Sequence, residues 1–426
     1  MQTLILDGSF KDDPIAAQIS AALHAQLPDA ETIAVREQKI GNCAGDFFCW
    51  VRSPGLCNTN DDNRIIAEKI MHSDLVINLT PITFGGYSSA LKRMVDHEIQ
   101  NILPFFATIN GEIHHQRRYR HYPNTLTIGW TDSPDAQAEA VFRHLVHRNA
   151  LNMYSSTAVC GIVDSTSDVD VQLRSWLAAV RRKESTPVPA LPRVDVFSAV
   201  AAPVQRTVLL VGSPRTQKST SASLGGYLME QLSARGIEAE TVQVYTSFNS
   251  AERTRLTLEK LDAADLVVLA FPLYVDSLPA PVIAALEKIA AHRASVKVTQ
   301  GFAAIANCGF PEASHNDTAL AICAQFARQA GMTWLGSLAL GGGEGIVHGV
   351  PLNKMDGRAI PLKKALDFAA ESLADGRPIP GSARDLMAGP VIPHWLYRFV
   401  GVFGWKRWAR EYGAEKSLKA RPYKVS

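Results

Sequence analysis

The strongest constraint on the fold is that one arrangement of segments occurs twice along the chain. "TLILDGS" (3–9) and "TVLLVGS" (207–213) are both short apolar runs that end in Gly-Ser. Farther along come "HSDLVINLTPITFGGYSSALKRMVD" (72–96) and "AADLVVLAFPLYVDSLPAPVIAALE" (263–287), in which Asp precedes an apolar run, a Pro-containing loop and an amphipathic stretch. The sequence therefore predicts two copies of one architecture in tandem.

A length of 426 residues leaves room for both copies. Between them lies "ESTPVPALPRVDVFSAVAAPVQ", which has four prolines and few large apolar side chains, as expected of an extended linker. We expect a first domain over 1–183, the linker over 184–205, a second domain over 206–388 and a C-terminal tail over 389–426.

In the second half, continuous apolar runs alternate with amphipathic stretches. Strands are expected at 207–211, 239–244, 265–271, 302–307 and 334–340. Helices are expected at 219–235, 252–263, 280–292, 315–331 and 360–374. Strands without polar alternation are buried on both faces, which is typical of a parallel sheet covered by helices. The fold class is therefore α/β, with a doubly wound sheet of flavodoxin-like order in each half, and ligands are expected beyond the carboxyl ends of the strands.

The loop "GSPRTQKSTS" (212–221) joins the first strand of the second half to a helix. The first amides of a helix have no acceptor within it, so they favour an anion there. Ser219, Thr220 and Ser221 add hydroxyl donors, and Arg215 or Lys218 can neutralise charge. We interpret the loop as a phosphate site, although an ordinary helix cap is the alternative. No G-x-G-x-x-G motif occurs, which argues against a Rossmann dinucleotide site.

Taken with "FPLYVDSLPAP" (271–281), this loop resembles the NADPH-dependent FMN reductase branch of the flavodoxin-like proteins, over about 206–375. The resemblance implies that five residues hold the FMN phosphate: Ser213, Arg215, Lys218, Ser219 and Ser221. It implies that four residues line the isoalloxazine ring: Pro272, Leu273, Tyr274 and Val275. A third loop, "NCGFPE", would bring Asn307, Cys308, Gly309 and Phe310 to the edge of the ring.

The first half resembles the multimeric-flavodoxin and iron–sulfur flavoprotein branch, through "GNCAGDFFCWVRSPGLCNTNDD" (41–62) and "TPITFGGYSSALKRMVDH" (80–97). Its implied ring loop contains Pro81, Thr83, Phe84, Gly85 and Gly86. Its first loop is less suited to phosphate, because Asp12 and Asp13 would repel it and only Ser9 and Lys11 favour it. Whether this half binds its own FMN is left open.

Three of the six cysteines, Cys43, Cys49 and Cys57, lie within fifteen residues. The iron–sulfur relatives have a cysteine near the place of Asp46, so the ligand set for a cluster is incomplete. An iron–sulfur cluster, a zinc site and a redox-active thiol pair remain alternatives, and thiols in a packed loop are the interpretation we favour. The number and scatter of the cysteines do not indicate a secreted disulfide scaffold, so we expect a cytoplasmic protein.

Two basic segments stand outside this plan. "GEIHHQRRYRHYP" (111–123) is interpreted as a solvated basic loop, with metal binding or an anion contact through Arg117, Arg118 and Arg120 as alternatives. The tail "VIPHWLYRFVGVFGWKRWAREYG" (391–413) combines three Trp with basic residues. We favour docking of the tail on protein over contact with a membrane surface.

These features together predict an oxidoreductase in which bound FMN takes hydride from NAD(P)H and reduces a small-molecule acceptor. Tyr274 and Cys308 are the nearest candidates for a catalytic role. The net charge of +2 gives no reason to expect a nucleic acid partner. The two copies are expected to form a pseudo-dimer within the chain, and whether two chains form a homodimer is left open. A flavodoxin-like electron carrier, which would use a cluster at the cysteine loop, and a flavin-free binding protein are the alternatives.

Overall fold

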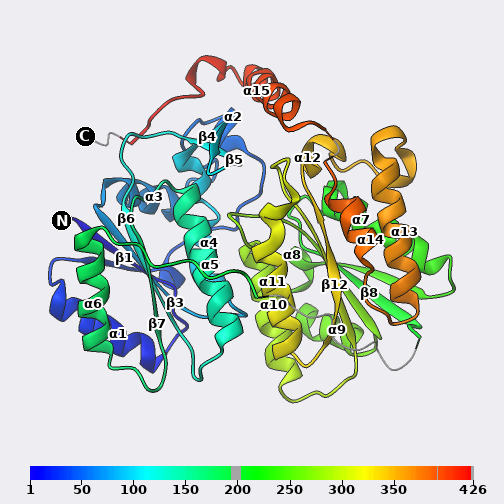
Figure 1. Cartoon of the computed structure of the whole chain (residues 1–426), viewed down its shortest axis with the longest axis horizontal. Coiled ribbons are helices and arrows are strands. Elements are labelled where there is room, and N and C mark those ends of the chain that lie inside the picture. The colour runs from blue at the N-terminus through cyan, green and yellow to red at the C-terminus, as the bar shows by residue number, and fades with distance from the viewer. Residues whose placement is uncertain (193–202, 391, 424–426) are drawn as a thin grey trace. The chain divides into compact units, whose positions relative to one another are not determined.

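A computed structural model describes residues 1–192, 203–390 and 392–423 (Figure 1). The chain divides into two compact units. The first consists of Met1–Pro192 with Trp395–Ser426, and the second of Arg193–His394. The tail, expected as a segment of its own, is thus part of the first unit. Most of the expected linker, residues 193–202, lies outside the described residues.

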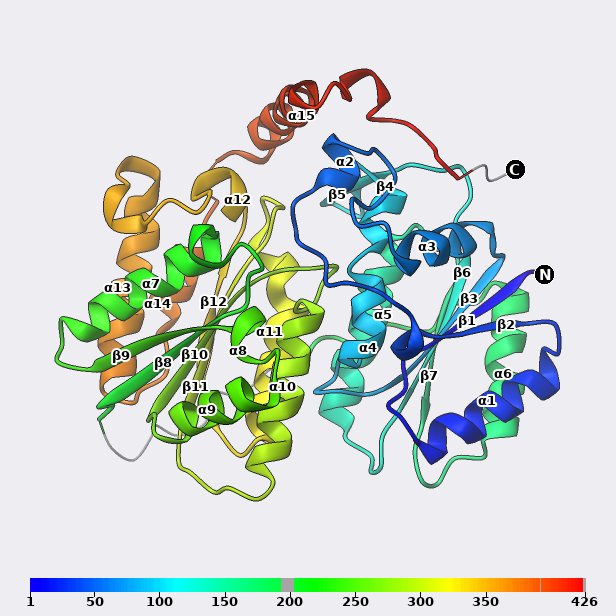
Figure 2. The ribbon, with the colours of Figure 1, turned by 180° about the vertical axis from the view of Figure 1, so that it is seen from behind.

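The second unit is a five-stranded parallel sheet in the order β9-β8-β10-β11-β12, which is the predicted doubly wound order (Figure 2). The strands are β8 (Arg206–Val211), β9 (Glu238–Gln243), β10 (Leu266–Pro272), β11 (Gly301–Asn307) and β12 (Thr333–Leu340). The longer helices are α7 (Thr220–Ser233), α9 (Ala251–Asp262), α10 (Ala280–Arg293), α11 (Asp317–Gln329), α13 (Ile360–Ala374) and α14 (Gly381–Ala388). All five predicted strands and all five predicted helices are present.

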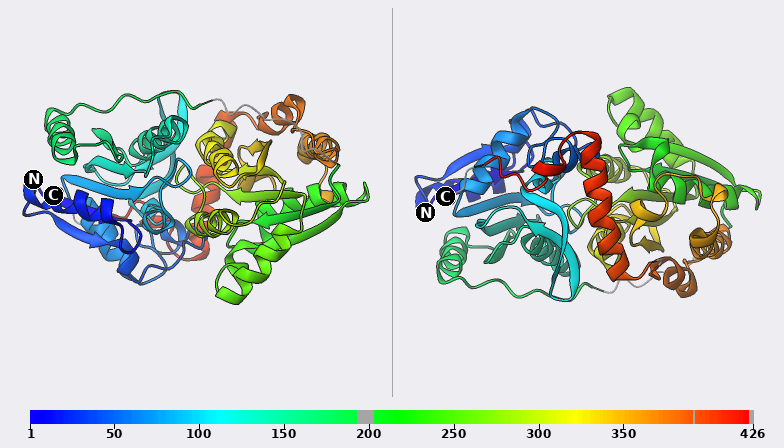
Figure 3. Two further views of the ribbon diagram at one scale, coloured as in Figure 1. Left: turned by 90° about the horizontal axis from the view of Figure 1, so that it is seen from below. Right: turned by 90° about the horizontal axis from the view of Figure 1, so that it is seen from above.

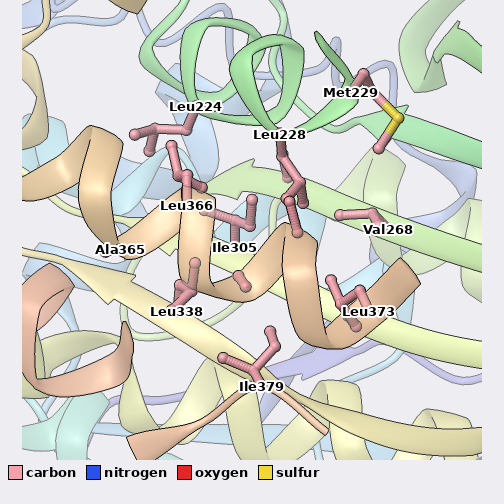
Figure 4. Packing of buried hydrophobic residues seen from close by; sticks show 14 of the residues in the cluster. Leu224, Leu228, Met229, Val268, Ile305, Leu338, Ala365, Leu366, Leu373 and Ile379 are labelled. Atoms are coloured by element: carbon pink, nitrogen blue, oxygen red, sulfur yellow. The ribbon is translucent and has the colours of Figure 1, made fainter. Parts of the chain in front are cut away.

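The core of this unit confirms why its strands lack polar alternation. Leu224 and Leu228 of α7 meet Leu366 of α13 over the inner strands β10 and β11 (Figure 4). On the other face, Phe302 of β11 packs edge-on against Phe326 of α11, with ring centroids 5.1 Å apart. The central strands are therefore covered by helices on both sides and bury apolar side chains in both directions.

The first unit repeats this sheet in the order β2-β1-β3-β6-β7. Its strands are β1 (Thr3–Asp7), β2 (Glu31–Ala34), β3 (Leu75–Pro81), β6 (Asn124–Trp130) and β7 (Ala158–Val163). Its longer helices are α1 (Pro14–Gln26), α3 (Asp62–His72), α4 (Ser89–Val95), α5 (Ala136–Asn152) and α6 (Val169–Arg182). An antiparallel hairpin of β4 (Ile102–Ile109) and β5 (Glu112–Arg117) is inserted between β3 and β6.

The internal repeat extends to single backbone hydrogen bonds. The amide of Gly8 donates to the carbonyl of Leu79, and the amide of Gly212 donates to the carbonyl of Ala270, both at 2.8 Å. Each glycine lies against the helix that follows the neighbouring strand. A Cβ added at Gly8 would lie 2.4 Å from Leu91 of α4, and one added at Gly212 would lie 2.6 Å from Val282 of α10. The turns after β3 and β10 are also alike, since both have two successive residues at positive φ. This equivalence confirms the predicted tandem architecture.

The segment 111–123 is not the solvated loop that its charge suggested. Residues 112–117 form β5, and the Arg118 side chain is buried with 1% of its surface exposed. Its guanidinium donates to the carbonyls of Leu418 and Ala420 at 3.3 and 2.6 Å. Because the side chain is buried and its guanidinium is bonded to these carbonyls, the alternative of an anion contact through Arg118 is wrong.

The tail contains α15 (His394–Glu411), and its residues from Trp395 onward belong to the first unit (Figure 3). The Trp405 ring meets the rings of Phe47 and Trp50 edge-on, with centroids 5.4 and 5.2 Å away. At the chain's end, the Tyr423 hydroxyl donates to the carbonyl of Arg64 at 3.1 Å. Docking of the tail on protein, the interpretation favoured from the sequence, is confirmed. Within the part of the chain that the structure describes, no helix has the length and apolar content to cross a bilayer.

Candidate functional site

The loop between β8 and α7 in the second unit has the features expected of a phosphate site. Ser219 is the N-cap of α7, and its hydroxyl accepts a hydrogen bond from the amide of Ala222 at 3.1 Å. The amides of Thr220 and Ser221, which begin the helix, have no acceptor among the described residues. Unbonded amides at a helix N-terminus attract an anion. This observation fits the phosphate of FMN.

The cations of this loop differ in their surroundings. The Arg215 guanidinium pairs with the Glu344 carboxylate at 2.5 Å, and both side chains are about one-third exposed. Lys218 is exposed. Ser213 is buried, with its hydroxyl 3.4 Å from the amide of Arg215. The structure therefore brings the five predicted phosphate residues into one loop, with Arg215 held by a carboxylate that competes with any bound anion.

That carboxylate belongs to the glycine-rich segment 341–350, which follows β12 and lies against the loop. The Thr220 hydroxyl donates to the carbonyl of Gly343 at 3.3 Å, and the Ser223 hydroxyl donates to the carbonyl of Val350. A Cβ at Gly349 would lie 2.5 Å from the carbonyl oxygen of Lys218. Nothing in the sequence indicated that Glu344 would pair with Arg215.

The turn after β10 contains the residues predicted to line a flavin ring. The amides and carbonyls of Tyr274 and Ser277 bond each other at 2.9 and 3.1 Å, which closes a tight turn through Val275 and Asp276 at positive φ. The four predicted ring residues are partly exposed: Pro272, Leu273, Tyr274 and Val275. Apolar side chains left accessible at the carboxyl end of a central strand suit a flat aromatic ligand.

The third loop joins the first one directly. The Asn307 amide nitrogen donates to the Ser221 hydroxyl at 2.9 Å and to the carbonyl of Phe271 at 3.0 Å. Gly309 is exposed, and a Cβ there would meet no atom within 4 Å. The Phe310 ring stacks on His315 at 4.4 Å between centroids. Asn307 thus ties the phosphate loop to the ring loop.

Cys308, a candidate for a catalytic role, is 3% exposed. Its thiol donates within its own loop, to the carbonyls of Phe310 and Glu312 at 3.4 and 3.5 Å. Burial raises the pKa of this thiol to about 12. The side chain is therefore a protonated thiol at neutral pH, which suits a structural role better than a nucleophilic one.

In the first unit, side chains of the protein bond the polar groups of the equivalent loop between β1 and α1. The Asp13 carboxylate caps α1 by accepting from the amides of Ile15 and Ala16 at 3.0 and 3.1 Å. The Ser9 hydroxyl accepts from Arg36, whose guanidinium also pairs with Asp7 at 3.2 Å. An anion would meet carboxylates here instead of open amides, so this loop does not fit a phosphate.

The ring loop of the first unit keeps the geometry of its counterpart. Thr83 and Gly86 bond each other at 2.9 and 2.7 Å around Phe84 and Gly85, both at positive φ. Pro81 and Thr83 are partly exposed, whereas Phe84, Gly85 and Gly86 are buried. The turn after β3 therefore has the backbone geometry of the turn after β10, with more of its residues buried.

The cysteine loop of the first unit contains a cysteine–histidine contact that the sequence did not indicate. The Cys57 sulfur lies 3.5 Å from His97 Nδ1, and His97 Nε2 lies 2.9 Å from the carbonyl oxygen of Gly41. Because a carbonyl only accepts, Nε2 carries a proton and Nδ1 faces the sulfur. All six cysteines are free thiols, and no metal-ligand group is found in the described parts of the chain. Thiols in a packed loop stay the favoured interpretation, and the cluster, the zinc site and the redox-active thiol pair stay alternatives.

We expect Cys57 to be the fastest thiol to react with iodoacetamide at neutral pH. Its hydrogen bond and charge interaction with His97 outweigh burial and lower its pKa, whereas burial raises the pKa of Cys43 to about 12. The thiolate form of Cys57 is lost only as the pH falls through that lowered pKa. Mass spectrometry after timed labelling of the native protein measures this order, and His97→Ala should shift the pH profile of Cys57 upward. Equal labelling of Cys43 and Cys57 would contradict the expectation.

The geometry defines a protein of two flavodoxin-like units in tandem. Residues 1–104 match the family model described as NADPH-dependent FMN reductase, and residues 205–347 match the model described as flavodoxin-like fold. These matches confirm the predicted resemblance to flavin reductases of this fold. The FMN reductase model falls on the first half, whereas we had drawn that resemblance from the loops of the second.

Solved structures with this fold align to less than half of the chain. NAD(P)H:quinone oxidoreductase from Methanothermobacter marburgensis is 16% identical over 40% of this chain and 96% of its own, with a TM-score of 0.32. An azoreductase from Bacillus anthracis is 13% identical over 40% and 99%, with a TM-score of 0.29. A flavone reductase is 11% identical over 41% of this chain and 65% of its own, with a TM-score of 0.31. The curated proteins include no match. Likenesses this distant support no conclusion about function.

Proposed function

We propose that the chain is an FMN-dependent NAD(P)H oxidoreductase that passes electrons to a small-molecule acceptor, and that its FMN binds the second unit. The open amides of Thr220 and Ser221 at the start of α7 are the observation that carries the proposal. The FMN reductase match of the first half supports the reaction class. FMN, when bound, supplies the acceptance of hydride from the nicotinamide and the transfer of electrons onward.

The residues of this chain have the roles of holding and orienting the flavin. Ser213, Arg215, Lys218, Ser219 and Ser221 would hold the phosphate. The turn at Pro272–Val275 would form the wall of the ring, and the loop from Asn307 to Phe310 its edge. Asn307 is the positioning residue between these parts, because its amide bonds both Ser221 and the carbonyl of Phe271. We assign no proton transfer to Cys308, since its thiol is buried and bonded within its loop.

In this proposal the first unit does not bind an FMN of its own. The Asp13 carboxylate already occupies the amides at the start of α1. The predicted contacts through Ser9, Pro81, Thr83, Phe84, Gly85 and Gly86 stay predictions, as does the cytoplasmic location, and the homodimer stays an open question. What the unit keeps is a packed turn after β3, which suits a structural role.

The test is an absorption spectrum of the purified protein after incubation with FMN and removal of the excess. We expect about one FMN per chain, because only one of the two loops leaves helix N-terminal amides open. Two FMN per chain would contradict the assignment of the first unit, and a protein that retains none would contradict the proposal. Steady-state oxidation of NAD(P)H with a quinone then separates an enzyme from an electron carrier.

A further inference from the structure

The outward face of α15 exposes an unusual amount of apolar surface. Trp395, Phe399, Val400 and Phe403 are 71, 61, 57 and 58% exposed. Positions four and eight residues apart lie on one side of a helix, so Trp395, Phe399 and Phe403 form a row. The rings of Phe399 and Phe403 touch, with centroids 4.8 Å apart. We call the surface formed by these four side chains and by Lys406, Arg407 and Arg410 the outer face.

The opposite face of α15 already has its partner. Trp405 packs against Trp50, and Tyr397 lies 5.9 Å from Phe106 between ring centroids. Gly401 faces Phe106 as well, since a Cβ there would approach its ring to 2.7 Å. The inner face fixes the helix on the first unit, and the outer face contributes nothing to that packing.

Cations continue the outer face along the same helix. Lys406, Arg407 and Arg410 are exposed, and the helical repeat places them on the side of Trp395 and Phe403. Arg410 is paired with Glu415 at 2.8 Å. Residues 395–423 contain seven basic and two acidic side chains, whereas the whole chain has a net charge of only +2. The positive charge of the protein is therefore concentrated in the segment that also exposes the aromatic row.

We propose that the outer face binds the surface of an anionic lipid bilayer, with α15 lying in the plane of the interface. Aromatic rings at the depth of the headgroups and basic side chains beside anionic lipids are the combination by which a helix adheres to a membrane without crossing it. A second copy of the chain is a poorer occupant. Two outer faces packed together would bring into contact two copies of a segment that has seven basic and two acidic side chains, and like charges repel.

The test is cosedimentation of the full-length protein with vesicles. One set contains phosphatidylcholine with a quarter of phosphatidylglycerol, and the other phosphatidylcholine alone. We expect binding to the anionic vesicles that weakens as salt is raised, because each basic side chain near the surface contributes about fivefold in partitioning. The triple variant Trp395→Ser, Phe399→Ser, Phe403→Ser should bind at least tenfold more weakly, and so should Lys406→Glu, Arg407→Glu.

A matched control replaces exposed apolar residues elsewhere in the chain. Ile65, Val171 and Ile360 are 57, 52 and 58% exposed, so their change to Ser removes similar side-chain surface. This control should bind vesicles as the unaltered protein does. The unfolding midpoint of every variant should stay close to that of the unaltered protein. The proposal is overturned if the unaltered protein stays in the supernatant, if the control loses as much binding as the outer-face variants, or if the outer face proves to join two copies in solution. Retention of FMN is measured in parallel and should be unchanged in all variants.

Discussion

Arg215→Ala should weaken FMN binding by about 10- to 100-fold, because it removes a charge-assisted hydrogen bond to the phosphate. Arg215 lies in the loop that precedes the open amides of α7 and is partly exposed. Isothermal titration of the flavin-free protein with FMN measures the loss. Folding should be preserved, since the Arg215 side chain is partly exposed and pairs with Glu344, which is also partly exposed.

The pairing with Glu344 provides a control of opposite sign. Glu344→Gln removes a carboxylate that competes with phosphate for the Arg215 guanidinium. We expect this variant to bind FMN more tightly than the unaltered protein, by up to about tenfold. Lys11→Ala, in the equivalent loop of the first unit, should leave both affinity and stoichiometry unchanged. If Arg215→Ala and Lys11→Ala had the same effect, the phosphate would not be bound where we place it.

Asp96→Ala should lower the free energy of unfolding of the first unit by about 3–5 kcal/mol, the usual cost of stranding a buried charge. The Lys92 ammonium and the Asp96 carboxylate form an ion pair in which both side chains are almost fully buried, at 0 and 1% exposure. The neighbouring Glu98 carboxyl is a poor replacement for Asp96, because burial is the largest influence on its pKa and raises it. Urea unfolding followed by tryptophan fluorescence measures the change, since six of the seven tryptophans lie in the first unit.

The double variant Lys92→Met, Asp96→Leu tests the cause. Removing both charges together leaves no stranded ion, so most of the stability lost in Asp96→Ala should return. Flavin release reports separately on the second unit and should occur at the same urea concentration in all three proteins. If the double variant were as unstable as Asp96→Ala, packing and not charge would account for the loss.

The alternation of buried strands and amphipathic helices was sufficient to predict the fold of both units. Apolar runs such as 207–211 and 302–307 leave no polar face, so they specify strands in the middle of a parallel sheet. The repeat predicted the matching turns after β3 and β10, because Gly8 and Gly212 are both followed by the same order of elements. The loop 212–221 could be proposed as a phosphate site from the sequence because its hydroxyls and cations lie within ten residues.

What the sequence did not predict depends on contacts between distant segments. Glu344 and Arg215 are 129 positions apart, and no local pattern links them. Arg118 looked like one of several surface cations, yet it lies buried under carbonyls near residue 420. Cys57 and His97 are separated by 40 positions and meet only because α4 and the cysteine loop fold together. The charge and spacing of residues along the chain do not show which side chains will contact residues that are distant in sequence.

The placement of residues 395–423 has a consequence for synthesis. The first unit is discontinuous in the gene, since the second unit, Arg193–His394, is translated before the segment that covers Trp50 and Arg118. At roughly 5–20 residues per second, a ribosome takes on the order of ten to forty seconds to make the intervening stretch. Throughout that interval the nascent first unit lacks the ring contact of Trp405 with Trp50 and two of the carbonyl acceptors of Arg118, and the second unit can complete its folding before the first one does.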